Sequence, residues 1–77
     1  MNKERRSRLS EISDLVGDAI DQLAEVMEEE QEALENLPES LQYSSKGETM
    51  QEYIDGIESI QSELEAIQTE INELIES

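Results

Sequence analysis

Carboxylates are the residues of this chain with the best means to do chemistry: the 77 residues include 21 Asp and Glu. Four of them recur at a helical spacing of three or four residues: Asp14, Asp18, Asp21 and Glu25. That spacing places them on one outer helix face, whereas a calcium loop needs Asp-x-Asp-x-Asp-Gly. Di-metal bundles need inward Glu residues with Glu-x-x-His ligands, and the chain has no His. We therefore expect no metal site and no cofactor.

Catalysis has no recognisable set of residues here. There is no Cys nucleophile, no Ser/His/Asp set and no glycine-rich phosphate loop, because Cys and His are absent and only three glycines occur. We therefore expect no catalytic and no cofactor-binding residues, and a protein that is not an enzyme.

The net charge of −16 limits the classes of partner that the chain can bind. Four of the five cations lie in the first eight residues: Lys3, Arg5, Arg6 and Arg8. Residues 9–77 hold 20 acids and one cation, Lys46, for a net charge of −19, which repels phosphates. No apolar run is long enough to span a bilayer, and no apolar core of a signal peptide is present. We expect a soluble cytoplasmic protein without direct nucleic-acid binding or membrane contact.

The second half of the chain has a strong heptad pattern. Apolar residues alternate in steps of three and four: Met50, Tyr53, Ile57, Ile60, Leu64, Ile67, Ile71 and Leu74. Ile54, Ala66 and Ile75 flank this row and widen the apolar stripe. Ser45 and Glu48 have the spacing of a capping box at the helix start. The pattern predicts a helix over about residues 46–76.

The first half repeats this pattern less regularly. One heptad position holds Leu9, Val16, Leu23 and Leu37, and another holds Ile12, Ala19, Val26 and Ala33, with Ile20, Met27 and Leu34 beside them. Glu30 stands where an apolar residue is due, either as a tolerated flaw or as a device for specificity. Pro38 disfavours helix at Leu37, which predicts a helix over about residues 3–36. The connector, residues 37–45, has room for one helical turn after Pro38.

Two helices joined by a short connector are expected to pack as antiparallel neighbours. The predicted fold is all-α: one domain, residues 1–77, forming an antiparallel αα-hairpin. In this register Arg5, Arg6 and Arg8 reach the acidic end of the second helix. Each apolar stripe is wider than one neighbour can cover, so we expect a homodimer that forms a four-helix bundle or coiled coil. The predicted core and dimer seam consists of Leu9, Ile12, Val16, Leu23, Val26, Ile57, Ile60, Leu64, Ile67, Ile71 and Leu74.

Two glycines lie inside the predicted helices. Gly17 and Gly56 each cost about 1 kcal/mol relative to Ala in a helix. They mark either a close approach of two helices or tolerated surface positions.

The connector carries a family resemblance. Asn36-Leu37-Pro38-Glu39-Ser40-Leu41-Gln42, followed by Ser44, Lys46-Gly47-Glu48 and Met50, resembles a group of small acidic coiled-coil proteins of bacteria and their phages or prophages. These proteins open with a basic Met-Asn-Lys-like start and close with an acidic helix rich in Leu and Ile. The resemblance implies a helical hairpin of bacterial or mobile-element origin, with no assigned activity and no site residues to carry over.

The acidic outer face allows two functional hypotheses. Five carboxylates crowd one face of the first helix: Asp18, Asp21, Glu25, Glu28 and Glu32. Like charges at i,i+4 destabilise a helix, and solubility does not require so many. The first hypothesis is an acidic coiled-coil module that binds a partner, including a basic protein surface. The alternative is a DNA mimic that inhibits a nucleic-acid-binding protein. If the acids are not used, Leu37, Leu41 and Tyr43 on the connector are the candidate anchors.

Overall fold

The first long helix, α1 (Lys3–Glu35), begins with a side-chain cap. Asn2 adopts extended backbone geometry, and its Oδ1 accepts a hydrogen bond of 2.9 Å from the Arg5 amide. This bond satisfies one of the amides that a helix start leaves unpaired. The helix ends at Glu35, with Asn36 as its C-cap two residues before Pro38, as the steric restriction imposed by proline predicts.

A side chain of the connector caps the C-terminal end of α1. A single helical turn, α2 (Glu39–Gln42), follows Pro38, whose carbonyl accepts hydrogen bonds from the Leu41 and Gln42 amides. The Gln42 side-chain amide donates to the carbonyls of Leu37, at 2.9 Å, and of Glu35, at 3.2 Å. The expected turn after Pro38 is confirmed, and its last residue satisfies carbonyls that the end of α1 leaves free.

The second long helix, α3 (Ser45–Glu76), begins one residue earlier than expected. The N-cap is Ser44, without a side-chain capping bond, so the predicted capping box of Ser45 and Glu48 is wrong. The Ser44 hydroxyl instead donates to the Leu41 carbonyl at the end of α2. Gly47 lies buried where α3 meets the connector, and an added Cβ would clash with the backbone carbonyl of Gln42. The close approach of the two backbones therefore requires glycine here.

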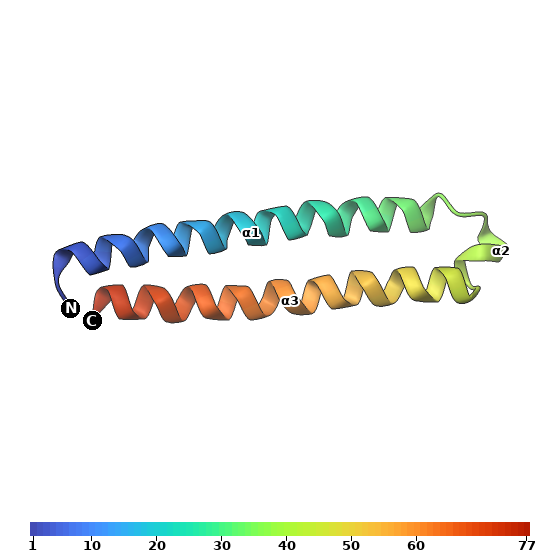
Figure 1. Cartoon of the computed structure of the whole chain (residues 1–77). Helices are drawn as coiled ribbons and strands as arrows, with labels where there is room; N and C mark the ends of the chain where they lie inside the picture. Colours follow the sequence, from blue (N-terminus) through green and yellow to red (C-terminus); the bar gives the residue numbers. More distant parts are fainter.

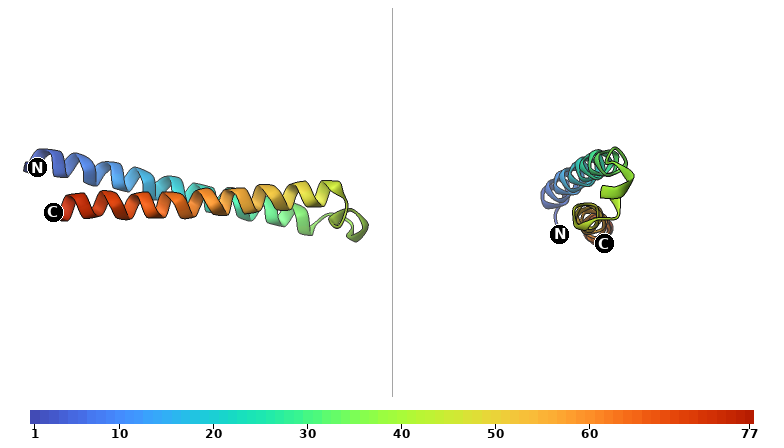
Figure 2. Two further views of the ribbon diagram at one scale, coloured as in Figure 1. Left: turned by 90° about the horizontal axis from the view of Figure 1, so that it is seen from below. Right: turned by 90° about the vertical axis from the view of Figure 1, so that its right-hand side faces the viewer.

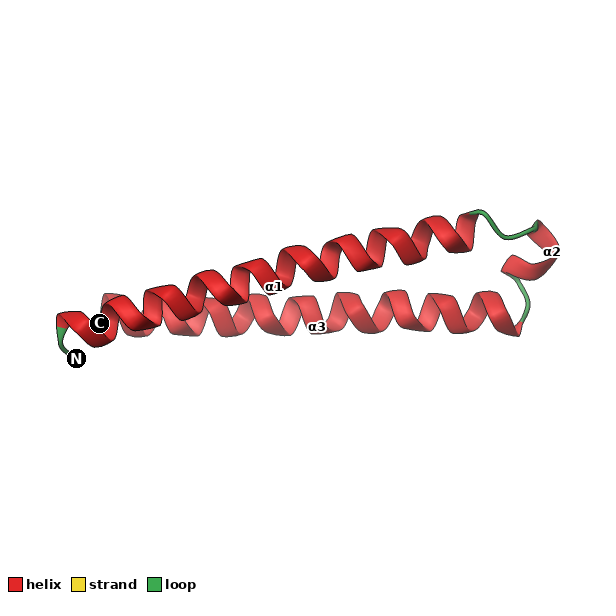
Figure 3. Ribbon diagram, turned by 45° about the horizontal axis from the view of Figure 1, so that its top comes forward, coloured by secondary structure: helices red, strands yellow, loops and turns green.

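The computed structural model describes all 77 residues, and α1 and α3 lie antiparallel along their whole lengths (Figure 1). The Cα trace measures 59 × 14 × 11 Å, with both termini at one end of the rod and α2 at the other (Figure 3). The helices cross at a shallow angle, as neighbours in a coiled coil do (Figure 2). The expected all-α antiparallel hairpin is confirmed. Neither long helix contains a stretch apolar enough to cross a membrane.

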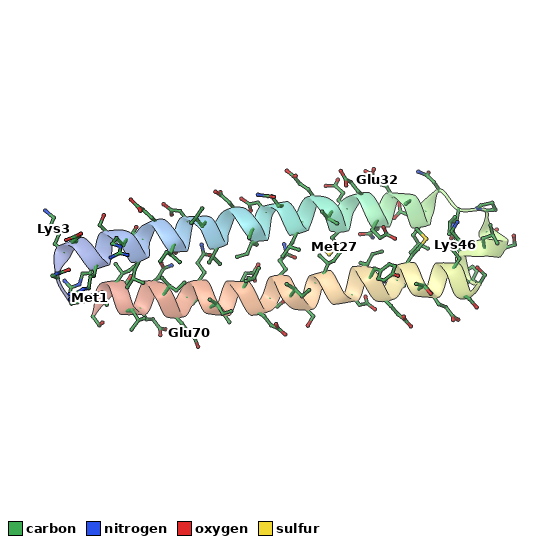
Figure 4. All side chains as sticks on the ribbon, in the orientation of Figure 1. Met1, Lys3, Met27, Glu32, Lys46 and Glu70 are labelled. Carbon is green, nitrogen blue, oxygen red and sulfur yellow. The ribbon has the colours of Figure 1, made fainter.

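The residues between the helices form an inner seam that follows a heptad pattern. In α3 it comprises Gly47, Met50, Ile54, Ile57, Gln61, Leu64, Gln68, Ile71 and Ile75, all buried or half-buried. In α1 it comprises Arg6, Leu9, Ser13, Val16, Ile20, Leu23, Met27, Glu30 and Leu34. Met27 lies between the two ribbons, whereas Glu32 and Glu70 point away from them (Figure 4). The best-buried apolar residue is Ile54, at 6% exposure.

This seam differs from the predicted one by a rotation of both helices of about half a residue step: each helix keeps one of its two predicted heptad positions in the seam, and the other position moves by one residue. Tyr53, Ile60, Ile67 and Leu74 were expected to face α1, but they are between 43% and 59% exposed. The positions that follow them, Ile54, Gln61, Gln68 and Ile75, face α1 instead. The rotation has a physical reason: both glutamine amides reach backbone carbonyls of α1. It also leaves the Tyr53 side chain exposed, at 59%.

Polar side chains connect the two helices across the seam. The Gln68 amide donates to the Ser13 carbonyl at 3.0 Å, and the Gln61 amide donates to the Ile20 carbonyl at 3.3 Å. The buried Ser13 hydroxyl donates to Asn72 Oδ1 at 2.8 Å. Since both donors and both acceptors are seven residues apart, these bonds help to set the register of the hairpin.

Candidate functional site

The exposed large apolar residues of α3 form one straight row. Tyr53, Ile60, Ile67 and Leu74 are seven residues apart and lie beside the inner seam. A row with the same heptad position runs along α1: Ile12, Ala19, Val26 and Ala33. We call these the outer rows of α3 and α1. Within them Ile12 and Val26 are exposed, as are the four members from α3.

Both outer rows lie on the same side of the hairpin. An antiparallel pair has a local two-fold axis perpendicular to the plane of its helices, so equal heptad positions share a face. Contacts on the other side agree: Ser13 bonds to Asn72, and a Cβ on Gly17 would lie 2.9 Å from Gln68 Nε2. We call the surface formed by the two outer rows the apolar face. It runs along the rod, and no element of the hairpin covers it.

Two shallow grooves open on or beside the apolar face. One, of about 520 Å³, is lined mainly by Leu15, Ala19, Leu23 and Val26 of α1. The other, of about 330 Å³, lies at the end of the rod that carries the termini, and Met1, Arg5, Arg8, Leu9 and Ile12 line it. Arg5 and Arg8 thus lie toward the apolar face, while the Arg6 guanidinium donates to the Ser77 carbonyl at 2.7 Å. Of the three arginines expected near the acidic end of α3, Arg6 caps its backbone.

The five predicted carboxylates of α1 form an acidic edge. Asp18, Asp21, Glu25, Glu28 and Glu32 are all exposed and lie outside the inner seam; Glu32 points away from both ribbons in Figure 4. Nowhere in the structure do three or more acidic side chains converge in a geometry that could hold a metal ion. The acidic edge is therefore an extended charged surface beside the apolar face, and Asp18 also lines the groove that opens there.

The three predicted anchors on the connector differ in their solvent exposure. Tyr43 and Leu41 are exposed, whereas Leu37 is half-buried. Tyr43 lines a groove of about 340 Å³ together with Leu34, Gln42, Gly47, Glu48 and Gln51. We call Leu37, Leu41 and Tyr43 the connector tip. It lies at the end of the rod opposite the two termini (Figure 1).

The predicted seam residues fall into two groups. Leu9, Val16, Leu23, Ile57, Leu64 and Ile71 lie in the inner seam. Ile12, Val26, Ile60, Ile67 and Leu74 lie on the apolar face, outside the hairpin core. Sequence reasoning missed Ser13, Gln61, Gln68 and Asn72, which connect the helices. The heptad spacing of Ser13, Gln61 and Gln68 was the signal that could have found them.

The two glycines within the helices also differ. A Cβ on Gly56 would meet no atom within 4 Å, so Gly56 is a tolerated surface position. Gly17 lies against the far end of the Gln68 side chain, and is thus close to the opposite helix.

Comparison of the chain with protein-family models, with curated proteins and with solved structures gives no match.

Proposed function

We propose that this chain is a non-catalytic protein-interaction module. In this proposal two copies associate through the apolar face, and each presents its acidic edge to a partner with a basic surface. The observation that supports it best is the presence of two surfaces side by side: large apolar side chains lie on one face, and the carboxylates of the acidic edge lie beside it on α1.

Association is supported by how little a single hairpin buries. Three residues are buried in the whole chain: Ser13, Gly47 and Ile54. Burial of apolar surface contributes about 25 cal/mol per Å², and a chain of this size needs most of its apolar area removed from water. A second copy on the apolar face would bury six exposed large side chains per chain and supply this missing stabilisation.

The acidic edge supports a partner of opposite charge. Its pairs Asp21/Glu25 and Glu28/Glu32 are four residues apart, and each such pair costs a helix a few tenths of a kcal/mol. A charge arrangement that opposes folding is consistent with use in binding, where complementary potentials speed association and exclude wrong partners.

A DNA mimic is the second candidate, and the charge density of a dimer favours it. A duplex has about one charge per 1.7 Å of its axis. One chain has a net charge of −16 along 59 Å, about one charge per 4 Å, which is too sparse. Two fully overlapping copies would have −32 along the same length, about one per 1.8 Å, close to the duplex value. The mimic would therefore be the dimer.

The interaction module and the DNA mimic can both be tested by capturing proteins from a lysate of the native host on the immobilised chain, at about 50 mM and at about 300 mM salt. The baits are the wild type, a variant with the acidic edge changed to Asn and Gln, and a matched control with Glu63, Glu65, Glu70, Glu73 and Glu76 changed to Gln. Both variants remove five charges. The module predicts a partner that is lost with the edge variant and kept with the control.

A mimic gives a different pattern. Its partner is weakened by both variants, released at the higher salt and displaced by duplex DNA, because total charge carries the binding. If the wild type retains no protein beyond those retained by an unrelated acidic chain, both candidates fail.

A further inference from the structure

The apolar face and the charge distribution together specify how a second copy packs. Resting on the proposed dimer, we infer that two hairpins associate face to face with their connector tips at opposite ends, so that α3 packs on α3 and α1 on α1. Three observations carry this arrangement: the area of the face, the symmetry of the outer rows and the unequal charge of the two ends of the rod.

The area suits one further copy of the hairpin. The broad side of the Cα trace measures 59 × 14 Å, a projected area of about 800 Å², and a standard interface buries about 800 Å² of accessible surface per partner, so this side is large enough to form one. A second rod of the same length covers this side completely when the two midpoints coincide. An occupant much shorter than the rod would leave part of the apolar face in water.

The outer rows match themselves when the rod direction is reversed. The second copy is related to the first by a two-fold axis that passes midway between Ile60 and Ile67 and inverts the direction of the rod. This rotation places Tyr53 over Leu74 and Ile60 over Ile67 of the second copy. The residues of α1 that lie beside this axis are identified by two contacts between the helices, that of Gln61 with Ile20 and that of Gln68 with Gly17. Ala19 lies beside the axis.

The same reversal completes the pairing on α1. It places Ala19 beside its own copy and Ile12 beside Val26. Large side chains then meet large ones, and the smallest residue at the centre lets the two α1 helices approach closely.

The uneven charge along the rod favours connector tips at opposite ends of the dimer over connector tips at the same end. Residues 20–63, at the connector end, hold 13 acids and one cation, a net charge of −12. Residues 1–19 and 64–77 hold 8 acids and four cations, a net charge of −4. Connector tips at the same end would put −12 beside −12, whereas tips at opposite ends put −12 beside −4. Opposite ends also bring the exposed Arg5 and Arg8 toward the acidic part of α1 around Glu29.

Disulfide cross-linking tests the arrangement, because the chain has no Cys and each variant carries a single thiol. A disulfide requires Cα atoms roughly 4.4–6.8 Å apart. A mixture of Tyr53→Cys and Leu74→Cys should give a reducible band of twice the chain mass that neither variant gives alone. Ala19→Cys, which leaves the large apolar side chains intact, should cross-link to itself.

Sedimentation equilibrium of the same reduced variants separates failure of the orientation from failure of the dimer. Tyr43→Cys, at the connector tip, should remain uncross-linked. A dimer in which Tyr43→Cys cross-links to itself and Ala19→Cys does not would overturn the orientation and leave the proposed dimer standing. Monomeric wild type would overturn both.

Charge reversal gives a second measurement that does not depend on cysteines. The double variant Arg5→Glu/Arg8→Glu should weaken dimerisation about tenfold or more, since each change counts twice in a symmetric dimer. Lys3→Glu is the control, because it makes the same change one turn away at a heptad position outside the outer rows. If Arg5→Glu/Arg8→Glu weakens dimerisation by no more than twice the free energy that Lys3→Glu does, Arg5 and Arg8 have no specific role.

Discussion

Single residues at the connector decide where the chain can turn, and glycine shows this most clearly. Gly47 and Gly56 both lie in α3, but an added methyl group would clash with the Gln42 carbonyl at the first and meet open space at the second. We expect Gly56→Ala to stabilise the fold by about 1 kcal/mol, the difference in helix propensity. Gly47→Ala should destabilise it by about 1–3 kcal/mol, because backbone has to move.

Thermal unfolding followed by circular dichroism measures both glycine variants. Each serves as the control of the other, since the substitution and the helix are the same. A Gly47→Ala variant as stable as Gly56→Ala would show that the connector does not pack on α3 as described.

The buried Ser13 provides a second residue-scale prediction. Ser13→Ala removes the donor to Asn72 Oδ1 and should cost about 1 kcal/mol, the usual net value of such a hydrogen bond. Ser10→Ala is the matched control, because Ser10 is exposed on the same helix and the change to Ala slightly favours helix. Urea unfolding of both variants gives the difference. Equal midpoints would mean that the Ser13 bond contributes nothing.

These polar residues also mark the limit of prediction from the sequence. The apolar heptads predict two helices without difficulty, but they assign the best row of large residues to the inner seam. Gln61 and Gln68 take that place because their amides reach main-chain carbonyls of Ile20 and Ser13. Carbonyls occur at every residue, so no side-chain pattern in α1 reveals which of them accept.

At the scale of elements, the helix ends followed from local chemistry to within about one residue. Pro38 acts within a few positions and places the end of α1 to within one residue, whereas the capping box expected at the start of α3 does not form. The rotation of α3 is a tertiary property and depends on all contacts along 32 residues at once. The acidic edge lay where helical spacing predicted it, because exposure outside the inner seam needs no partner.

The acidic edge gives an element-scale prediction on salt. Raising the salt from about 10 mM to about 300 mM shortens the screening length from about 30 Å to about 6 Å, which weakens repulsion along α1. The melting temperature of the wild type should therefore rise. The edge variant with Asn and Gln should start from a higher melting temperature and respond less to salt. A melting temperature that falls with added salt would indicate that specific favourable contacts hold these carboxylates.

At the scale of the whole molecule, the inner seam and the apolar face should respond differently to the same truncation. Leu64→Ala truncates a side chain of the inner seam between α1 and α3 and should cost about 2–5 kcal/mol of stability. Ile60→Ala removes an exposed side chain of the hairpin, so its cost should appear through loss of the dimer. Melting at a series of protein concentrations distinguishes the two, because dimer stability depends on concentration. Identical concentration dependence in both variants would count against the division into an inner seam and an outer apolar face.

The central claim is that a second copy covers the apolar face, and sedimentation equilibrium tests it most directly. At micromolar concentration the wild type should have twice the 8.8 kDa mass of the chain. A variant with Ile60→Gln and Ile67→Gln, which keeps helix propensity and leaves the inner seam unchanged, should sediment at the mass of one chain and be less helical than the wild type, because it lacks the stabilisation that the second copy supplies. A wild type that stays fully helical at 8.8 kDa would contradict the account.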